Sequence, residues 1–187
     1  MFDLSLIVIK MSNSILQDMS TNITVRRISP EDNDLINVLA SYHAEAFGDS
    51  HGRTPTDRAK EMHEHALKGT GSSAVPMTLV ALIENELAGS CRICEDDFDG
   101  VRPNLTPWLA TLFVLPSYRG KGVGSALANN AANEVKSSGC GGVLYLWACE
   151  REVAMGMYRK LGWEVIEETV PPHKEDFDLA IIMKRNL

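Results

Sequence analysis

The chain has 187 residues, and its 18 basic and 25 acidic side chains give it a formal net charge of −7. This length suits one domain with a substantial core, and the composition is that of an ordinary globular protein. The acidic balance argues against nucleic-acid binding, which needs a basic surface, and it favours a cationic or small neutral partner. No apolar stretch approaches the length that spans a bilayer, so we expect no membrane partner.

The N-terminal segment differs in character from the rest of the chain. Residues 2–9 form a short apolar run with no basic segment before it and no small-residue cleavage site after it. This pattern argues against a signal peptide. We expect residues 1–22 to be an extension, either disordered or an added strand, and residues 23–187 to form a single domain.

Two helices are predicted after a first strand. Residues 23–28 alternate apolar and polar side chains, which indicates the strand. Ser29 and Pro30 then predict a helix start, with Ser29 as N-cap and Pro30 at the first helical position. A second helix is predicted from about Thr54 to Gly69, where glycine ends the periodic pattern.

A hairpin and a buried strand follow in the middle of the chain. Residues 77–83 and 87–94 flank a short polar turn, which is typical of a hairpin. Residues 95–104 form a polar, acidic loop, and the nearly continuous apolar run of residues 109–114 predicts a buried strand.

The C-terminal part alternates helices and strands. Helical spacing over residues 127–135 predicts a helix closed by Gly139, and the apolar run 143–147 predicts a buried strand. A short helix is expected to end at Gly162, and the chain finishes with two strands at 163–168 and 177–183. The order of elements predicts an α/β (α+β) fold with a mixed sheet.

Cysteine and histidine spacing gives no sign of a metal site. Cys91 and Cys94 have C-x-x-C spacing, but no second pair supplies the four ligands that structural zinc requires. In a strand, these two side chains would point to opposite faces. We interpret them as buried thiols of a cytoplasmic protein, and we expect no metal.

A glycine-rich turn, Tyr118-Arg-Gly-Lys-Gly-Val-Gly124, lies between the predicted strand 109–114 and the helix after it. Glycines let the backbone approach a ligand closely, and the first N–H groups of a helix have no partner within the helix. The helix dipole adds about half a positive charge there, so a phosphate is the natural ligand. The glycine spacing fits neither a P-loop nor a dinucleotide-binding turn.

The combination of Val114-Leu-Pro-Ser-Tyr118-Arg-Gly-Lys-Gly-Val-Gly124, the element order and Tyr158-Arg-Lys-Leu-Gly-Trp163 resembles the GCN5-related N-acetyltransferase (GNAT) superfamily. The resemblance covers about residues 23–187. It implies the GNAT fold, a twisted mixed sheet that is splayed at its centre and has helices on both faces. It also implies acetyl-CoA as cosubstrate.

The resemblance assigns roles to residues of the turn and its flanks. The turn would hold the pyrophosphate, the preceding strand would pair with the pantetheine arm, and a backbone N–H near Val114 would polarise the thioester carbonyl. Tyr158 would protonate the departing thiolate as general acid. The residues expected to bind the cosubstrate are Leu112, Phe113, Val114, Arg119, Gly120, Lys121, Gly122, Val123 and Gly124.

The general base is not assigned by the resemblance. Many relatives carry a glutamate on the strand before the glycine turn, but residues 109–114 contain no acid. An alkylamine is mostly protonated at pH 7, so a proton acceptor is needed. Asp96, Asp97 and Glu150 are candidates because they lie near predicted strand ends that could face the split, and ordered waters are an alternative.

The sequence therefore predicts acetyl transfer from acetyl-CoA to a primary amine, by direct attack in a ternary complex. The acidic surface favours a small-molecule amine as acceptor. Acetylation of protein N-termini or lysines is one alternative, and a CoA-binding sensor without turnover is another. For the oligomeric state the expectation is a homodimer, because two-fold dimers are the commonest soluble oligomers.

Overall fold

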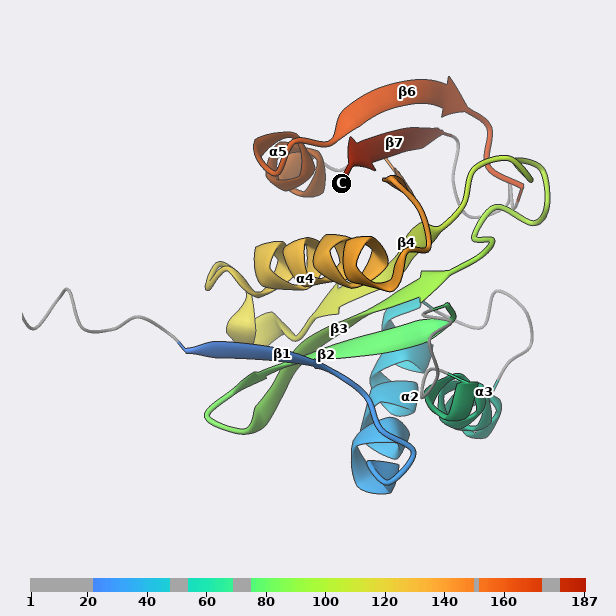
Figure 1. The fold of residues 1–187 in the computed structure, drawn as a ribbon. Coiled ribbons are helices and arrows are strands. Elements are labelled where there is room, and N and C mark those ends of the chain that lie inside the picture. The colour runs from blue at the N-terminus through green and yellow to red at the C-terminus, as the bar shows by residue number, and fades with distance from the viewer. Residues whose placement is uncertain (1–21, 48–53, 69–74, 150–151, 173–178) are drawn as a thin grey trace, which may run out of the picture.

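The computed structural model describes residues 22–47, 54–68, 75–149, 152–172 and 179–187. They form one sheet of order β1-β2-β3-β4-β5-β7-β6, flanked by helices (Figure 1). The strands are β1 (Ile23–Arg27), β2 (Met77–Ile83), β3 (Glu86–Cys94), β4 (Trp108–Val114), β5 (Val143–Ala148), β6 (Glu164–Thr169) and β7 (Ala180–Asn186). The helices are α2 (Asn33–Phe47), α3 (Pro55–Lys68), α4 (Val123–Ser138) and α5 (Glu152–Lys160), with a 3-10 turn, η1 (Pro116–Tyr118). The α/β prediction with a mixed sheet is confirmed.

The sheet opens between β4 and β5. These two strands are parallel, and the only registered pair between them joins Trp108 to Tyr145 among the residues described. Beyond that pair, β4 continues to Val114 and β5 to Ala148, and no further pair between these two strands is registered among the described residues. The other neighbouring strands are antiparallel and paired over most of their length. The splayed centre expected from the sequence is therefore confirmed.

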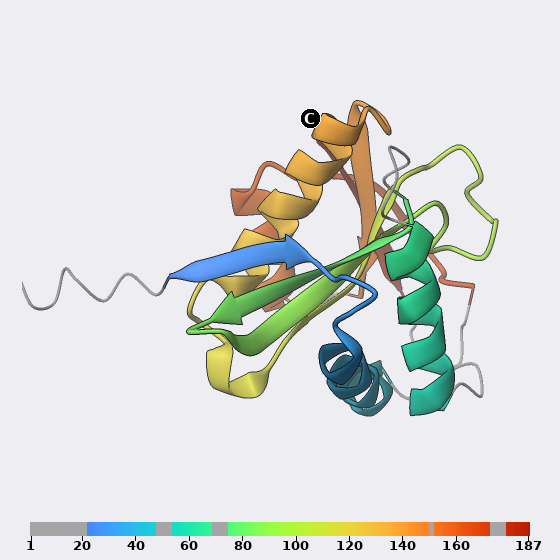
Figure 2. The ribbon, with the colours of Figure 1, turned by 60° about the horizontal axis from the view of Figure 1, so that its bottom comes forward.

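Helices cover both faces of the sheet, as expected. Helix α4 lies on one face, and α2 and α3 lie together on the other (Figure 2). Leu127 of α4 belongs to a buried cluster with Leu79 of β2, whereas Leu39 of α2 packs in a cluster with Val80. Because Leu79 and Val80 are neighbours in β2, they point to opposite faces, and each face has its own apolar layer.

The start of α2 differs from the prediction. Ser29 and Pro30 form a turn, and the helix begins at Asn33. The Asp32 carboxylate accepts a hydrogen bond from the Ser29 N–H (2.8 Å), and the Asp32 carbonyl accepts the bond from the Ile36 N–H (2.9 Å). The same carboxylate pairs with Arg26 (2.6 Å). Asp32 thus takes the capping position that we had assigned to Ser29, because the ion pair with β1 fixes it there.

The last strand also differs from the prediction, because β7 begins at Ala180 and continues past Met183 to Asn186. The apolar pattern stopped at Met183, yet Lys184 pairs with Tyr145 of β5, and the Arg185 side chain binds Asn129 of α4 (2.7 Å). Residues 177 and 178 of the predicted strand lie outside the described residues. In the part of the chain that the structure describes, no helix is long and apolar enough to cross a bilayer.

Candidate active site

The glycine turn has the conformation that an anion cradle requires. Gly120 and Gly122 have φ values of +76° and +86°, which side chains rarely adopt. Gly122 is the N-cap of α4, and no side chain caps this end of the helix. The first N–H groups of α4 are therefore open to a ligand, and the helix dipole favours an anion there.

Two cationic side chains border this turn. Arg119 is exposed and its Nε donates to the Val114 carbonyl (3.2 Å), which ties the turn to the end of β4. The Lys121 ammonium lies 5.0 Å from the centre of the Tyr118 ring. Both charges add to the positive potential at the start of α4.

Three elements meet at Gly124, in the first turn of α4. A Cβ atom built on Gly124 would lie 3.0 Å from Met157 Sδ and 3.7 Å from Leu112 Cδ2. Glycine at this position thus lets the Met157 side chain of α5 pack directly against the start of α4, beside Leu112 of β4. The contact places Tyr158, the next residue after Met157, in the helix that borders the cradle.

Strand β4 carries a bulge where it leaves β5, which the sequence did not reveal. Ser90 pairs with Phe113 and Arg92 pairs with Ala110, so two residues of β4 lie opposite Cys91 alone. One of the two, Thr111, has φ +47°, which is strained for a β-branched residue. Its hydroxyl oxygen is buried without a hydrogen-bond partner among the described residues.

Tyr158 is buried, with 7% of its surface exposed, and its ring lies edge-on to Trp163 at 5.8 Å. Burial raises the pKa of its hydroxyl, and the Cys91 thiol raises it further. The phenol therefore stays protonated at neutral pH, as a proton donor must. Cys91 is the residue opposite the bulge of β4, so Tyr158 lies near the point where β4 separates from β5.

On the opposite face, α2 packs against β4. Tyr42 and His43 lie 6.2 Å and 6.1 Å from the Phe113 ring. His43 Nε2 is 2.9 Å from the Ser90 hydroxyl. Burial, with the nearby cations, lowers the pKa of His43 to about 4, so its ring is neutral at pH 7. Beside Phe113, this face of the sheet carries aromatic rings and a neutral histidine.

Two of the candidate bases, Asp96 and Asp97, are neighbours in the acidic loop but have different surroundings. Asp96 is exposed, and its two oxygens accept hydrogen bonds from the N–H groups of Phe98 (3.0 Å) and Gly100 (2.7 Å). Asp97 points inward, where its Oδ2 accepts a hydrogen bond from Trp147 Nε1 (3.0 Å). Glu150, the third candidate, lies outside the described residues.

Asp97 belongs to a chain of charges on the face covered by α3. Arg92 of β3 lies 3.5 Å from Asp97 and 2.8 Å from Glu61 of α3. Burial raises the pKa of Asp97 to about 6, although Arg92 and Trp147 oppose that rise. No cluster of three metal ligands occurs among the described residues.

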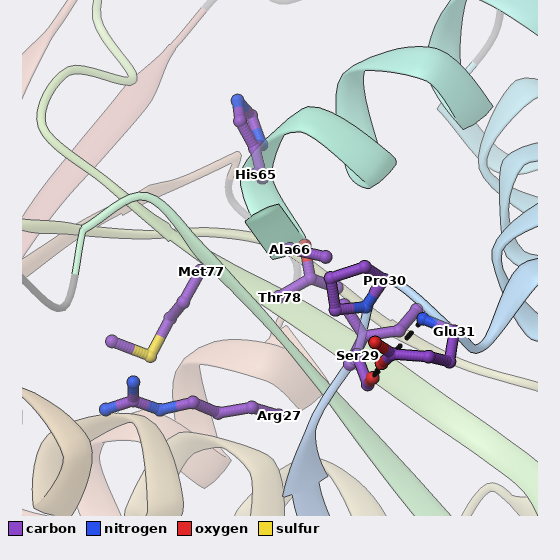
Figure 3. A pocket seen from close by; sticks show the side chains of 9 residues that line it. Arg27, Ser29, Pro30, Glu31, His65, Ala66, Met77 and Thr78 are labelled. Atoms are coloured by element: carbon purple, nitrogen blue, oxygen red, sulfur yellow. Dashed lines mark hydrogen bonds between the residues drawn. The ribbon is translucent and has the colours of Figure 1, made fainter. Parts of the chain in front are cut away.

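A pocket of about 230 Å³ lies between the turn after β1 and the last turns of α3, away from the split (Figure 3). None of the predicted site residues contributes to it. Its lining is formed by Arg27, Ile28, Ser29, Pro30, Glu31, His65, Ala66, Met77 and Thr78.

Comparisons with known proteins agree with this geometry. Residues 36–163 match the family model described as the acetyltransferase (GNAT) family. A GNAT-family acetyltransferase from Streptococcus pneumoniae has the same fold, with a TM-score of 0.66 at 22% identity over 89% of this chain and 99% of that one. An aminoglycoside 6′-N-acetyltransferase complexed with coenzyme A gives 0.66 at 18% identity over 87% and 96%. The PaiA N-acetyltransferase from Thermoplasma acidophilum, in complex with coenzyme A, gives 0.59 at 18% over 89% and 99%.

Proposed function

Since the chain belongs to the acetyltransferase (GNAT) family, we propose that it transfers the acetyl group of acetyl-CoA to a primary amine of a small molecule. The transfer takes place by direct attack in a ternary complex, without a covalent enzyme intermediate.

The observation that carries the proposal is the opening beside β4 that leads to an uncapped helix start. The backbone of Leu112, Phe113 and Val114 lies along the edge of β4 that β5 leaves unpaired, so it can pair with the amide groups of the pantetheine arm. The backbone N–H groups from Arg119 to Gly124 can receive the pyrophosphate. The two binding surfaces are continuous along the chain, as a long cosubstrate requires.

Three effects then account for the chemistry. Holding thioester and amine together removes most of the entropic cost of a bimolecular step. A backbone N–H near Val114 stabilises the oxyanion that develops on the thioester carbonyl. The Tyr158 hydroxyl, protonated at neutral pH, supplies the proton that the departing thiolate takes up.

A small-molecule acceptor is supported by two observations. Aminoglycoside acetyltransferases are among the structural neighbours, and the net charge of −7 attracts a cationic amine.

The buried free thiols Cys91 and Cys94 support the cytoplasmic location that the sequence suggested. Protein N-terminal or lysine acetylation is the alternative within the same chemistry, and a CoA-binding sensor is the alternative without turnover.

Two measurements test the proposal. Acetyl-CoA at saturating concentration should raise Tm by mass action, and an unchanged Tm would refute the cosubstrate. Thiol release from acetyl-CoA is then followed with spermidine, kanamycin, lysine and a short peptide with a free N-terminus. Release with spermidine or kanamycin supports a small-molecule acceptor, release with the peptide alone indicates protein acetylation, and binding without release indicates a sensor.

A further inference from the structure

We propose that Asp97 is the general base of the reaction, the group that takes the proton from the acceptor amine. This inference rests on the proposed function. Its basis is the position of the Asp97 carboxylate, which is held between β3 and β5 across the point where β4 and β5 separate.

The sheet register fixes that position. Arg92 of β3 pairs with Ala110 of β4, and directly opposite residues of an antiparallel pair point to the same face. Trp108 pairs with Tyr145, so Ala110 and Trp147 are each two residues beyond the last pair of β4 and β5. Arg92 and Ala110 thus lie side by side on the face that α3 covers, and Trp147 shares an apolar cluster with Ala110 on that face, across the split.

The Asp97 side chain bridges Arg92 and Trp147. Its Oδ1 lies 3.5 Å from Arg92 Nη2. Trp147 Nε1 donates both to Asp97 Oδ2 at 3.0 Å and to the Asp97 carbonyl at 2.8 Å. The carboxylate therefore lies between Arg92 of β3 and Trp147 of β5, the strands on either side of β4 in the sheet order. Its side chain is 19% exposed, which lets a proton leave to solvent after each turnover.

The residue after Ala110 marks the same part of β4 as a functional site. Thr111 holds a strained positive φ, and its buried hydroxyl lacks a hydrogen-bond partner among the described residues. Strained backbone and unpaired buried polar groups are concentrated at functional sites. The strained residue and the bulge thus mark the point where β4 leaves β5, directly after Ala110 in the chain, and the Asp97 carboxylate lies between β3 and β5 across that point.

The surroundings suit a carboxylate that exchanges protons near neutral pH. Burial raises the pKa of Asp97 to about 6, whereas Arg92 lowers it. Arg92 is closer to Glu61, at 2.8 Å, than to Asp97, at 3.5 Å, so the guanidinium is only partly available to Asp97. A base with a pKa near the working pH is the most effective. The charged or titratable groups around Asp97 are Arg92, Asp96 and Cys94, with Glu61 acting through Arg92.

The proton balance of the step is as follows. The neutral amine nitrogen attacks the carbonyl carbon of the thioester, and the new C–N bond leaves the nitrogen positively charged. Asp97 takes a proton from that nitrogen, directly or through one water molecule. The C–S bond breaks, and the thiolate takes the proton of the Tyr158 hydroxyl. Exchange with water returns the proton of Asp97 to solvent and restores Tyr158, so the products are the amide and free CoA.

The test compares Asp97→Asn with Asp99→Asn. Asparagine at 97 keeps an oxygen that can accept the Trp147 bond but cannot take the proton. Asp99 lies in the same loop with φ +51°, a conformation that asparagine tolerates, so its variant makes the same charge change as a control. Each protein is assayed with whichever of spermidine, kanamycin, lysine or peptide gives the fastest thiol release. Tm, the Kd for acetyl-CoA and the pH profile of kcat/KM are measured beside it, and the Asp97 carboxyl carbon is titrated by NMR.

Asp97→Asn should lower kcat at pH 7 by about 100-fold or more, with Tm close to that of the unmodified protein and Kd for acetyl-CoA within twofold. The acidic limb of its kcat/KM profile near pH 6 should disappear, and Asp99→Asn should retain both rate and profile. Unchanged kcat in Asp97→Asn overturns the inference while the proposed function stands. A loss of rate that follows equal losses of Tm and acetyl-CoA affinity also overturns it, because the role is then structural. If the unmodified protein releases thiol with none of the amines, the proposed function fails, and the inference fails with it.

Discussion

Replacing Gly122 by alanine adds one methyl group at the N-cap of α4, where φ is +86°. The nearest heavy atom to the new Cβ is Ile23 Cδ1 at 3.8 Å, an ordinary contact, so space does not oppose the change. The cost is the left-handed backbone, about 1–2 kcal/mol for a residue with a side chain. The smaller entropy of the unfolded chain returns about 0.4–1 kcal/mol. The net loss of about 1 kcal/mol should lower Tm by roughly 2–4 °C in a chain of this size.

Gly139 provides a matched control at the other end of the same helix. It is the C-cap of α4 with φ +69°, and no heavy atom of the described residues lies within 4 Å of a Cβ built there. Gly139→Ala therefore introduces the same backbone strain and should lower Tm by a similar amount. Only the Gly122 methyl group lies beside the N–H groups that are proposed to hold the pyrophosphate.

The two variants should therefore differ in acetyl-CoA binding alone. Calorimetric titration should show Kd raised at least about tenfold in Gly122→Ala, which corresponds to about 1.4 kcal/mol, and unchanged in Gly139→Ala. Scanning calorimetry without ligand checks that both lose comparable stability. If Gly122→Ala loses stability but binds acetyl-CoA as tightly as the unmodified protein, the phosphates do not lie on this turn, and the reasoning from helix and glycines is refuted.

Three further outcomes are expected. Tyr158→Phe should keep its contact with Trp163 and its acetyl-CoA affinity but lower kcat at least about tenfold in single-turnover assays; an unchanged chemical step would remove the general-acid role. Thr111→Gly should relieve about 1–3 kcal/mol of backbone strain, whereas the added flexibility of glycine in the unfolded chain costs about 0.5–1 kcal/mol. Tm should therefore stay the same or rise, while kcat falls. A Tm several degrees lower would contradict the strain at Thr111. Glu61→Gln removes the ion-pair partner that holds Arg92, so Arg92 should interact more strongly with Asp97 and lower the pKa of Asp97 below about 6. The acidic limb of the kcat/KM profile should then move to lower pH. A shift to higher pH would contradict this ion-pair arrangement.

The fold and the conformation of the glycine turn could be predicted because their signals are local. Apolar periodicity marked the strands and helices, and boundaries mostly agreed within one or two residues. Gly120 and Gly122 adopt positive φ angles that glycine favours, so the residue type alone indicates a turn of this conformation. The N-cap of α2 was misplaced because an ion pair between Asp32 and Arg26 decided between two acceptable capping residues.

Which side chains of the acidic loop point toward the sheet depended on tertiary packing. Asp96 and Asp97 are neighbours of the same residue type, and nothing in their order shows which one points inward. Phe98 decides this, because its buried ring stacks on Trp108 at 6.0 Å and meets Trp147 at 5.8 Å, which anchors the loop over β4 and β5. The loop has no regular period, so the facing of its side chains cannot be predicted from spacing.

The sequence by itself determined the family, the element order and the position of the glycine turn, since each depends on residues close together in the chain. The tertiary structure decided where β4 separates from β5, the bulge that strains Thr111, and the inward orientation of the Asp97 carboxylate toward Arg92 and Trp147. These features depend on contacts between residues far apart in the chain. A bulge arises from the register between two strands, and the pKa of Asp97 arises from burial among β3, β5 and its own loop.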